Sequence, residues 1–223
     1  MSDDWLTLLR ESTDGFAASV DRADPGVPIT WCPGWTLHDL VDHLGGVHQW
    51  AAHAVVVGTP DLEPEPVERG ADLAGWYRRH ADHLLDVLIS SPADAPAWTL
   101  DRTDRTAGFW RRRQVHETVV HTWDAQESLG DANPIDPALA WDGVLEVRDV
   151  LYPRQVHLGR VAPLPSALTL VATDVDGEIV LGSGEPVVVR DRAEVLLRML
   201  WHRADTGSVD AAATALLAGA LTP

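Results

Sequence analysis

The spacing of apolar residues predicts a series of helices over the first two thirds of the chain. Apolar side chains there recur every three or four residues, which is the period of one helical face. The first helix, over residues 5–22, is predicted from Trp5, Leu8, Leu9, Phe16 and Val20. Further helices are expected from Thr36 onward, over 72–89, over 109–130 and over 136–152.

The last third of the chain changes from a helical period to alternation. Residues 166–173 alternate around three apolar positions, Leu168, Leu170 and Ala172, and short apolar runs follow at 179–181 and 187–189. Period-two alternation predicts half-buried strands, and Asp176-Gly177 is a hairpin-turn sequence.

A helix over 192–201 and a short alanine-rich helix are expected to complete the chain. Helices followed by a small group of strands and helices define the α+β class. We therefore predict an up-down helical bundle in residues 1–155 and a small α+β domain in residues 156–223.

Composition and charge narrow the classes of function. The chain has 223 residues, of which 45% are hydrophobic and 23% charged, as is usual for a globular protein. Its 34 acidic and 17 basic residues give a net charge of -17, which repels phosphate backbones and anionic membrane surfaces. We expect neither nucleic acid nor a membrane as a partner.

The cysteine content and the short apolar runs favour a cytoplasmic location for the protein. Cys32 is the one cysteine, so the chain cannot form an internal disulfide. The longest apolar run, residues 51–57, is interrupted by His53 and is too short to span a bilayer. The sequence shows no basic leader with an apolar core, so a cytoplasmic protein is expected.

The stretch 109–130 carries the candidate chemistry. Arg113, Glu117, His121 and Asp124 follow one another at spacings of four, four and three, so their side chains lie along one face of a helix. A carboxylate and an imidazole four residues apart on a helix can share one metal ion. The alternative is a solvated pair of side chains on the helix surface, which contributes little.

A third ligand is available from the helix that begins at Thr36. His43 is spaced by three or four residues from apolar neighbours, Leu40, Val47 and, one turn later, Trp50, so we expect it on the inward face. The histidines recur every five residues at His38, His43, His48 and His53, which turns consecutive members by about 140°. We expect only His43 to face the core squarely; the alternative is a hydrogen-bonded core histidine without a metal.

Metal sites in helical bundles are built from inward side chains of facing helices. His43, Glu117 and His121 would supply two imidazoles and one carboxylate. Three protein ligands leave one position of a tetrahedral zinc ion open, which is typical of a catalytic site. Cys32 lies in a lead-in rich in proline, and we expect it to be a small packed side chain rather than a fourth ligand.

Two segments carry a resemblance to a known family. Residues 27–51, VPITWCPGWTLHDLVDHLGGVHQWA, and residues 109–126, FWRRRQVHETVVHTWDAQ, resemble the mycothiol-dependent maleylpyruvate isomerase family. The N-terminal domain of that family is a DinB-like metal-binding four-helix bundle, and residues 196–203, LLRMLWHR, look like part of its small second domain. The resemblance implies that His43, Glu117 and His121 hold the metal.

The resemblance also implies roles for Asp124 and Arg203. Asp124 would orient His121 or the thiol, and the guanidinium of Arg203 would turn towards the metal position and clamp a substrate carboxylate. His202 stands where the family usually has glycine. The alternatives are an ion pair on the helix face for Asp124 and one at the domain interface for Arg203.

The implied activity is thiol chemistry. A divalent metal, with zinc as the expected ion, would deprotonate a low-molecular-weight thiol, and the resemblance implies that this thiol is mycothiol. The thiolate would add to the cis double bond of maleylpyruvate and leave again after rotation, giving fumarylpyruvate. Alternatives are mycothiol S-transfer to electrophiles and a non-catalytic binding or regulatory bundle. The expected partners are a small-molecule substrate and the thiol, with the protein as a monomer or homodimer.

Overall fold

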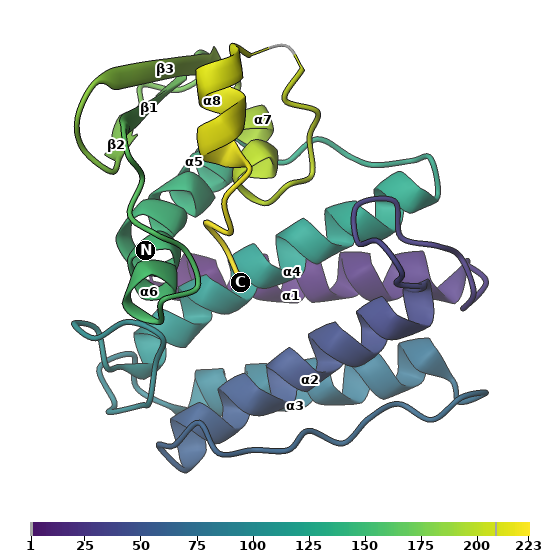
Figure 1. Ribbon diagram of the computed structural model, residues 1–223. Coiled ribbons are helices and arrows are strands. Elements are labelled where there is room, and N and C mark those ends of the chain that lie inside the picture. The colour runs from purple at the N-terminus through teal and green to yellow at the C-terminus, as the bar shows by residue number, and fades with distance from the viewer. Residues whose placement is uncertain (1, 208) are drawn as a thin grey trace. The chain divides into compact units, whose positions relative to one another are not determined.

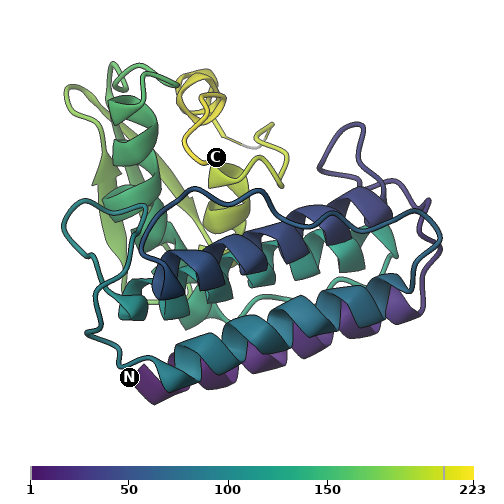
Figure 2. The ribbon, with the colours of Figure 1, turned by 90° about the horizontal axis from the view of Figure 1, so that it is seen from below.

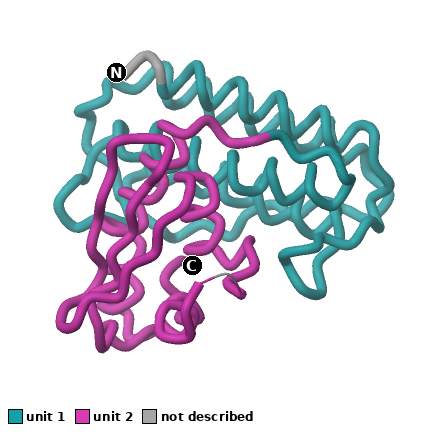
Figure 3. Tube along the Cα trace, turned by 90° about the horizontal axis from the view of Figure 1, so that it is seen from above, with its two compact units in different colours: residues 1–133 teal, residues 134–223 magenta. Residues whose placement is uncertain are grey.

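The protein separates into two compact units. The computed structural model describes residues 2–207 and 209–223, with side chains from Trp5 onward. The units are residues 1–133 and residues 134–223 (Figure 3). The first is helical and the second combines helices with a three-stranded sheet, so the α+β class is confirmed. The division lies earlier than the expected boundary at 155/156, because the helix after residue 136 packs on a helix of the second unit.

Four long helices form the first unit: α1 (Ser2–Asp21), α2 (Leu37–Val56), α3 (Leu73–Ser90) and α4 (Ala107–Ser128). Helix α1 packs against α3 and α4, and α2 packs against the same two helices (Figures 1 and 2). The core between them is filled by apolar and aromatic side chains that are fully buried, including Phe16, Leu40, Leu44, Tyr77 and Leu84.

The approach of α2 to α3 depends on a glycine. A Cβ atom built on Gly45 would lie 2.1 Å from the ring of Trp76, which is closer than any real contact. Any other residue at position 45 would therefore have to displace the Trp76 ring or move α2 away from α3.

The helix ends follow from local sequence. Thr36 and Asp39 form a capping box at the start of α2, with each side chain accepting a hydrogen bond from the other residue's backbone N–H. Asp72 caps α3 in a similar way through Gly75 N. Gly130 follows the end of α4 with a φ of 76°, the left-handed conformation that glycine adopts without strain.

Most side chains of the connection between α2 and α3 are exposed. Its backbone, however, is hydrogen-bonded along α2 (Figure 2). Asp42 Oδ1 accepts a 2.7 Å bond from Val67 N, and the Gln49 side-chain amide pairs with the backbone N–H and carbonyl of Glu65. Val67 is buried in the bundle core.

The second unit begins with a helical segment that contains a wider turn. Helix α5 (Pro137–Glu146) is capped by Asp136 and continues through a π-helical turn, η1 (Val147–Leu151), into α6 (Tyr152–His157). The single helix expected over 136–152 is therefore longer and is interrupted in its hydrogen-bond pattern.

The sheet of the second unit has the order β2-β1-β3. Strands β1 (Ala167–Ala172) and β2 (Glu178–Leu181) form the expected antiparallel hairpin, and β3 (Pro186–Asp191) pairs with β1 in parallel. One face is buried through alternate apolar residues, Leu168, Leu170, Ile179, Leu181 and Val189. Helices α7 (Ala193–Leu200) and α8 (Ala211–Leu217) complete the unit.

None of the helices in the described part of the chain has both the length and the apolar character needed to cross a membrane.

Candidate metal centre

Helix α4 buries polar side chains that helices normally turn to solvent. The buried polar residues are Arg111, Arg113, Gln114, His116, Glu117, Thr118, His121 and Asp124. Charged residues are rarely buried unless they are paired or bind a metal. The buried polar side chains of α4 are therefore candidates for a functional site.

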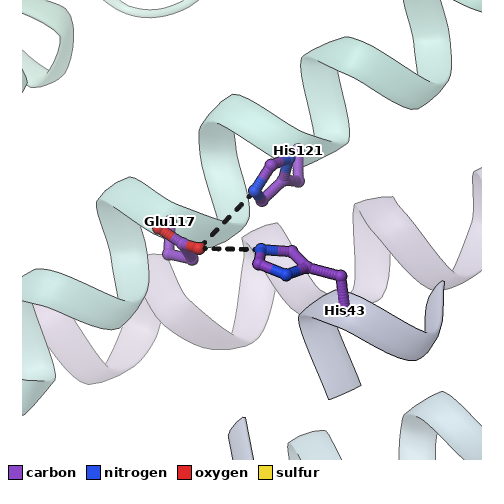
Figure 4. Close-up of side chains that lie close together, drawn as sticks. All are labelled: His43, Glu117 and His121. Carbon is purple, nitrogen blue, oxygen red and sulfur yellow. Dashed lines mark hydrogen bonds and ion pairs between the residues drawn. The ribbon is translucent and has the colours of Figure 1, made fainter. Parts of the chain in front are cut away.

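Three of the predicted residues meet there. Nε2 of His43, on α2, lies 3.3 Å from Oε1 of Glu117, and Nε2 of His121 lies 3.5 Å from the same oxygen (Figure 4). The two imidazole rings are 5.0 Å apart, centre to centre, and nearly perpendicular. One ligand atom from each of the three residues lies within 4.8 Å of the others, and no other set of His, Cys, Asp and Glu in the described residues does this.

Arg113 occupies the other oxygen of Glu117. Its guanidinium forms a buried ion pair with Oε2, one helical turn before the carboxylate. Burial alone would raise the pKa of Glu117, but the charge of Arg113 and hydrogen bonds from His121 and His43 outweigh it and hold this pKa well below its usual value. Glu117 is thus a carboxylate that presents one oxygen, Oε1, to the two histidines.

Asp124 holds the far side of His121. Its Oδ2 is 2.9 Å from Nδ1 of His121, and Asp124 is completely buried. Burial by itself lowers the pKa of His121, but the hydrogen bonds to Asp124 and Glu117 raise it to about 9. Cys32 Sγ also donates to Oδ2 of Asp124, at 3.7 Å. Cys32 is the buried core side chain that was expected, with a contact to Asp124 that sequence reasoning did not include.

The donor set fits a divalent cation. Tetrahedral zinc with ligand bonds of about 2.0–2.2 Å places neighbouring ligand atoms about 3.4 Å apart, close to the two measured nitrogen–oxygen distances. The second ring nitrogen of His121 is held by a carboxylate, as is usual for metal-binding histidines. The side chain of His43 is 35% exposed while that of Glu117 is 8% exposed, so solvent reaches the group at His43.

One expectation about α2 was wrong. His43 does not face the core squarely, because Leu40, Val41, Leu44 and His48 form the buried face and His43 lies on its flank. His48 is the fully buried histidine: its Nδ1 is 2.8 Å from Gln114 Oε1 and its Nε2 is 3.0 Å from the Tyr77 hydroxyl. Burial lowers the pKa of His48 to about 4, against the opposing effect of Gln114.

Arg203 belongs to the second unit, and its role stays a prediction. Its Nη1 donates to the carbonyl of Trp201, and its guanidinium lies 5.7 Å from the centre of the Trp201 ring. His202 has a φ of 57°, which explains why glycine suits this position. The His202 ring offsets that strain by donating from Nε2 to the carbonyls of Leu217 and Gly219, at 2.9 and 3.0 Å.

Two histidines and one carboxylate that converge from facing helices have the arrangement from which metal sites in helical bundles are built. Residues 6–126 match the family model of the mycothiol maleylpyruvate isomerase N-terminal domain. This match covers more than half of the chain, and the chain belongs to that family.

Two other proteins are similar to this chain over about two thirds of its length. Two uncharacterized proteins of Mycobacterium tuberculosis, MT0763 of strain CDC 1551 / Oshkosh and Rv0738 of strain H37Rv, are each 24% identical to this chain over 157 residues. The aligned part is 68% of this chain and 81% of either relative.

Two crystal structures share the fold. The mycothiol-dependent maleylpyruvate isomerase superposes with a TM-score of 0.66 at 17% identity, covering 93% of this chain and 91% of the other. A histidine-to-alanine mutant of the mycothiol-dependent maleylpyruvate isomerase gives a TM-score of 0.66 at 15% identity, with 89% and 88% covered. At this identity the likeness establishes the fold.

Proposed function

We propose that the protein is a metal-dependent and mycothiol-dependent enzyme that isomerises a cis double bond of the maleylpyruvate type. The observation that carries the proposal is the meeting of His43, Glu117 and His121 within 4.8 Å. Membership of the mycothiol maleylpyruvate isomerase family supports the thiol and the substrate class.

The charges around the three ligands favour a cation. Glu117 and Asp124 are both buried, and the buried guanidinium of Arg113 pairs with Glu117. Two carboxylates and one guanidinium leave one negative charge, which a proton on His121, whose pKa is about 9, balances in the metal-free protein. A divalent cation would take the place of that proton. Buried charge of this kind is stabilised when a metal ion neutralises it.

Each of the surrounding residues has a definite part in holding that ion. Arg113 fixes one oxygen of Glu117, so the other oxygen is turned to the histidines. Asp124 accepts from Nδ1 of His121 and leaves Nε2 as the ligand atom. A bound divalent cation, zinc in our proposal, would lower the pKa of a thiol bound to it, so that the thiol would ionise near neutral pH.

The reacting thiol has to come from a cosubstrate. Cys32 is buried, and its Sγ is turned to Asp124 rather than to the three ligands. In the proposed reaction the cosubstrate sulfur adds to one carbon of the cis double bond, and the adjacent carbon becomes a carbanion stabilised by the carbonyl. Rotation about the resulting single bond and departure of the same sulfur give the trans isomer, so the thiol is regenerated.

We also propose that Arg203 receives a carboxylate of the substrate. A guanidinium binds a carboxylate through two parallel hydrogen bonds, which a lysine ammonium does not. The guanidinium of Arg203 makes a cation–π contact with the Trp201 ring, which helps to position it. Arg203→Lys should raise KM for the substrate while leaving the zinc content unchanged; a lower zinc content with unchanged KM would assign Arg203 a structural role instead.

The test of the function is conversion of maleylpyruvate to fumarylpyruvate by the purified protein, with and without mycothiol and before and after removal of metal. We expect turnover only with both, and constant free thiol while product accumulates. Isomerisation without added thiol would contradict the proposal. Consumption of one thiol per product would show S-transfer in place of isomerisation.

A further inference from the structure

A groove of about 400 Å³ lies between α2 and the connection that follows it. Small-molecule sites have volumes of about 300–1,000 Å³, so the groove is large enough for a ligand. Its lining residues are Asp42, His43, Gly46, Val47, Trp50, Leu62, Pro64, Glu65 and Pro66. All of them lie in the first unit.

The groove is held open by hydrogen bonds at both ends. Trp50 Nε1 donates to the carbonyl of Pro60 at 2.8 Å, and Asp42 Oδ1 accepts from Val67 N at 2.7 Å. Between them, Gln49 pairs with both backbone groups of Glu65, at 2.9 and 3.0 Å. A wall fixed in this way does not have to be ordered when a ligand binds, which lowers the free-energy cost of binding.

The groove leads to the candidate metal centre. His43 lines it, and Nε2 of the same residue is 3.3 Å from Oε1 of Glu117. Val47 and Trp50 follow His43 at four and seven residues, on the same side of α2. At 1.5 Å per residue the groove therefore extends about 10 Å along the helix from His43 to Trp50. A ligand lying in it could place one end at the metal.

The charges of the residues that line the groove disfavour the binding of anions. Asp42 and Glu65 are the charged residues of the lining, and arginine is not among the lining residues in the described chain. A dicarboxylate would meet two negative charges with no compensating cation. Hydroxyl groups can donate to these carboxylates, and an apolar surface can pack on Val47, Trp50, Leu62 and the prolines.

We propose that this groove binds the non-reacting part of the thiol cosubstrate, an uncharged body with many hydroxyl groups, and so presents the sulfur to the centre at His43. This inference rests on the proposed function, because it assigns the groove to the cosubstrate of the same reaction. Mycothiol fits the chemistry: its cysteine is acylated and joined through an amide to an amino sugar and an inositol, so its body carries hydroxyls and no net charge.

The test separates binding of the body from chemistry at the sulfur. The probe is S-methyl mycothiol, which has the body but cannot form a thiolate, titrated calorimetrically into the zinc-loaded full-length protein. Val47→Phe fills the groove from α2. Val56→Phe is the matched control, because Val56 is 67% exposed at the end of the same helix and does not line the groove. Leu62→Ala removes wall from the opposite side.

We expect the wild type and Val56→Phe to bind the probe equally, Val47→Phe to bind at least tenfold more weakly, and Leu62→Ala at least threefold more weakly, all with unchanged zinc content. Equal binding by all four proteins, or no binding by the wild type, would overturn the groove assignment. If the variants lose probe binding as expected but the wild type has no isomerase activity, the groove assignment would stand and the proposed reaction would be rejected. If turnover depends on the thiol but Val47→Phe does not change KM for mycothiol, the proposed reaction would stand and the groove assignment would be rejected.

Discussion

Nδ1 of His121 and Oδ2 of Asp124 lie 2.9 Å apart on one face of α4. The contact fixes the imidazole so that its other nitrogen, Nε2, faces Glu117 Oε1 at 3.5 Å. A buried carboxylate behind a histidine both orients the ring and makes it a better ligand. This pair therefore connects the buried polar face of α4 with the proposed metal chemistry.

Replacing Asp124 by Asn should weaken zinc binding by about 10–100-fold, because the side chain keeps its shape but loses the charge that supports His121. Competition with a chromophoric chelator measures the affinity. Asp131→Asn is the control. Asp131 lies in the loop after α4 and forms an exposed ion pair with Arg22. Equal zinc affinity in wild type and Asp124→Asn would show that Asp124 does not act through the metal.

Replacing Arg113 by Met should destabilise the metal-free protein by about 3 kcal/mol, because it leaves the buried Glu117 without its guanidinium partner. Zinc should restore more stability to this variant than to the wild type, since the ion neutralises the same carboxylate. Urea unfolding with and without zinc measures both effects. Arg112→Met, which changes the half-buried neighbour, is the control; an equal loss in the two variants would argue against the buried pair.

His48 should make the protein less stable in acid. Its pKa is about 4 in the folded state and about 6.5 when unfolded, so the unfolded chain takes up the proton first as the pH falls. Stability from this group is complete above pH 6.5 and is lost between pH 6.5 and 4, by about 3 kcal/mol in total. Urea unfolding of metal-free wild type and His48→Gln from pH 7 to 4 tests this. Parallel pH curves for the two proteins would contradict it.

Cys32→Ala should preserve thiol-dependent turnover and lower the free energy of unfolding by about 1 kcal/mol, because the side chain is a packed core group with one weak hydrogen bond to Asp124. Turnover, zinc content and urea unfolding of the variant measure this. Loss of turnover with zinc content and fold intact would mean that the protein's own sulfur is the nucleophile.

The sequence was sufficient to predict the helices and to select the three candidate ligands that lie close together in the structure. Thr36 with Asp39 marks the start of α2 by local hydrogen bonding, which sequence patterns record directly. Glu117 and His121 share a face of α4 by their spacing alone. His43 was proposed from its apolar spacing on α2, and the resemblance to the family connected it with Glu117 and His121, because no local pattern relates residues 74 positions apart.

Other features of the site depend on packing between distant segments. The buried face of α2 includes Leu44 and His48. The apolar spacing of Leu40, Val47 and Trp50 predicted instead that the flank of this face, where His43 lies, would be buried. The hydrogen bonds of His48 to Gln114 and Tyr77, and of Cys32 to Asp124, join different helices and loops. The wall of the groove is held by hydrogen bonds between the backbone of the α2–α3 connection and side chains of α2. The proline-rich, acidic sequence of this connection does not predict such hydrogen bonds.

The most direct test of the account is the amount of zinc that remains bound per chain after equilibrium dialysis. The wild type should retain one zinc ion, and Glu117→Gln, which keeps the size of the side chain and removes the charged ligand, should retain almost none at the same free zinc concentration. His80→Ala, a histidine of α3 outside the three-residue group, should behave as the wild type. One zinc ion retained by Glu117→Gln as firmly as by the wild type would contradict the assignment of the metal to His43, Glu117 and His121.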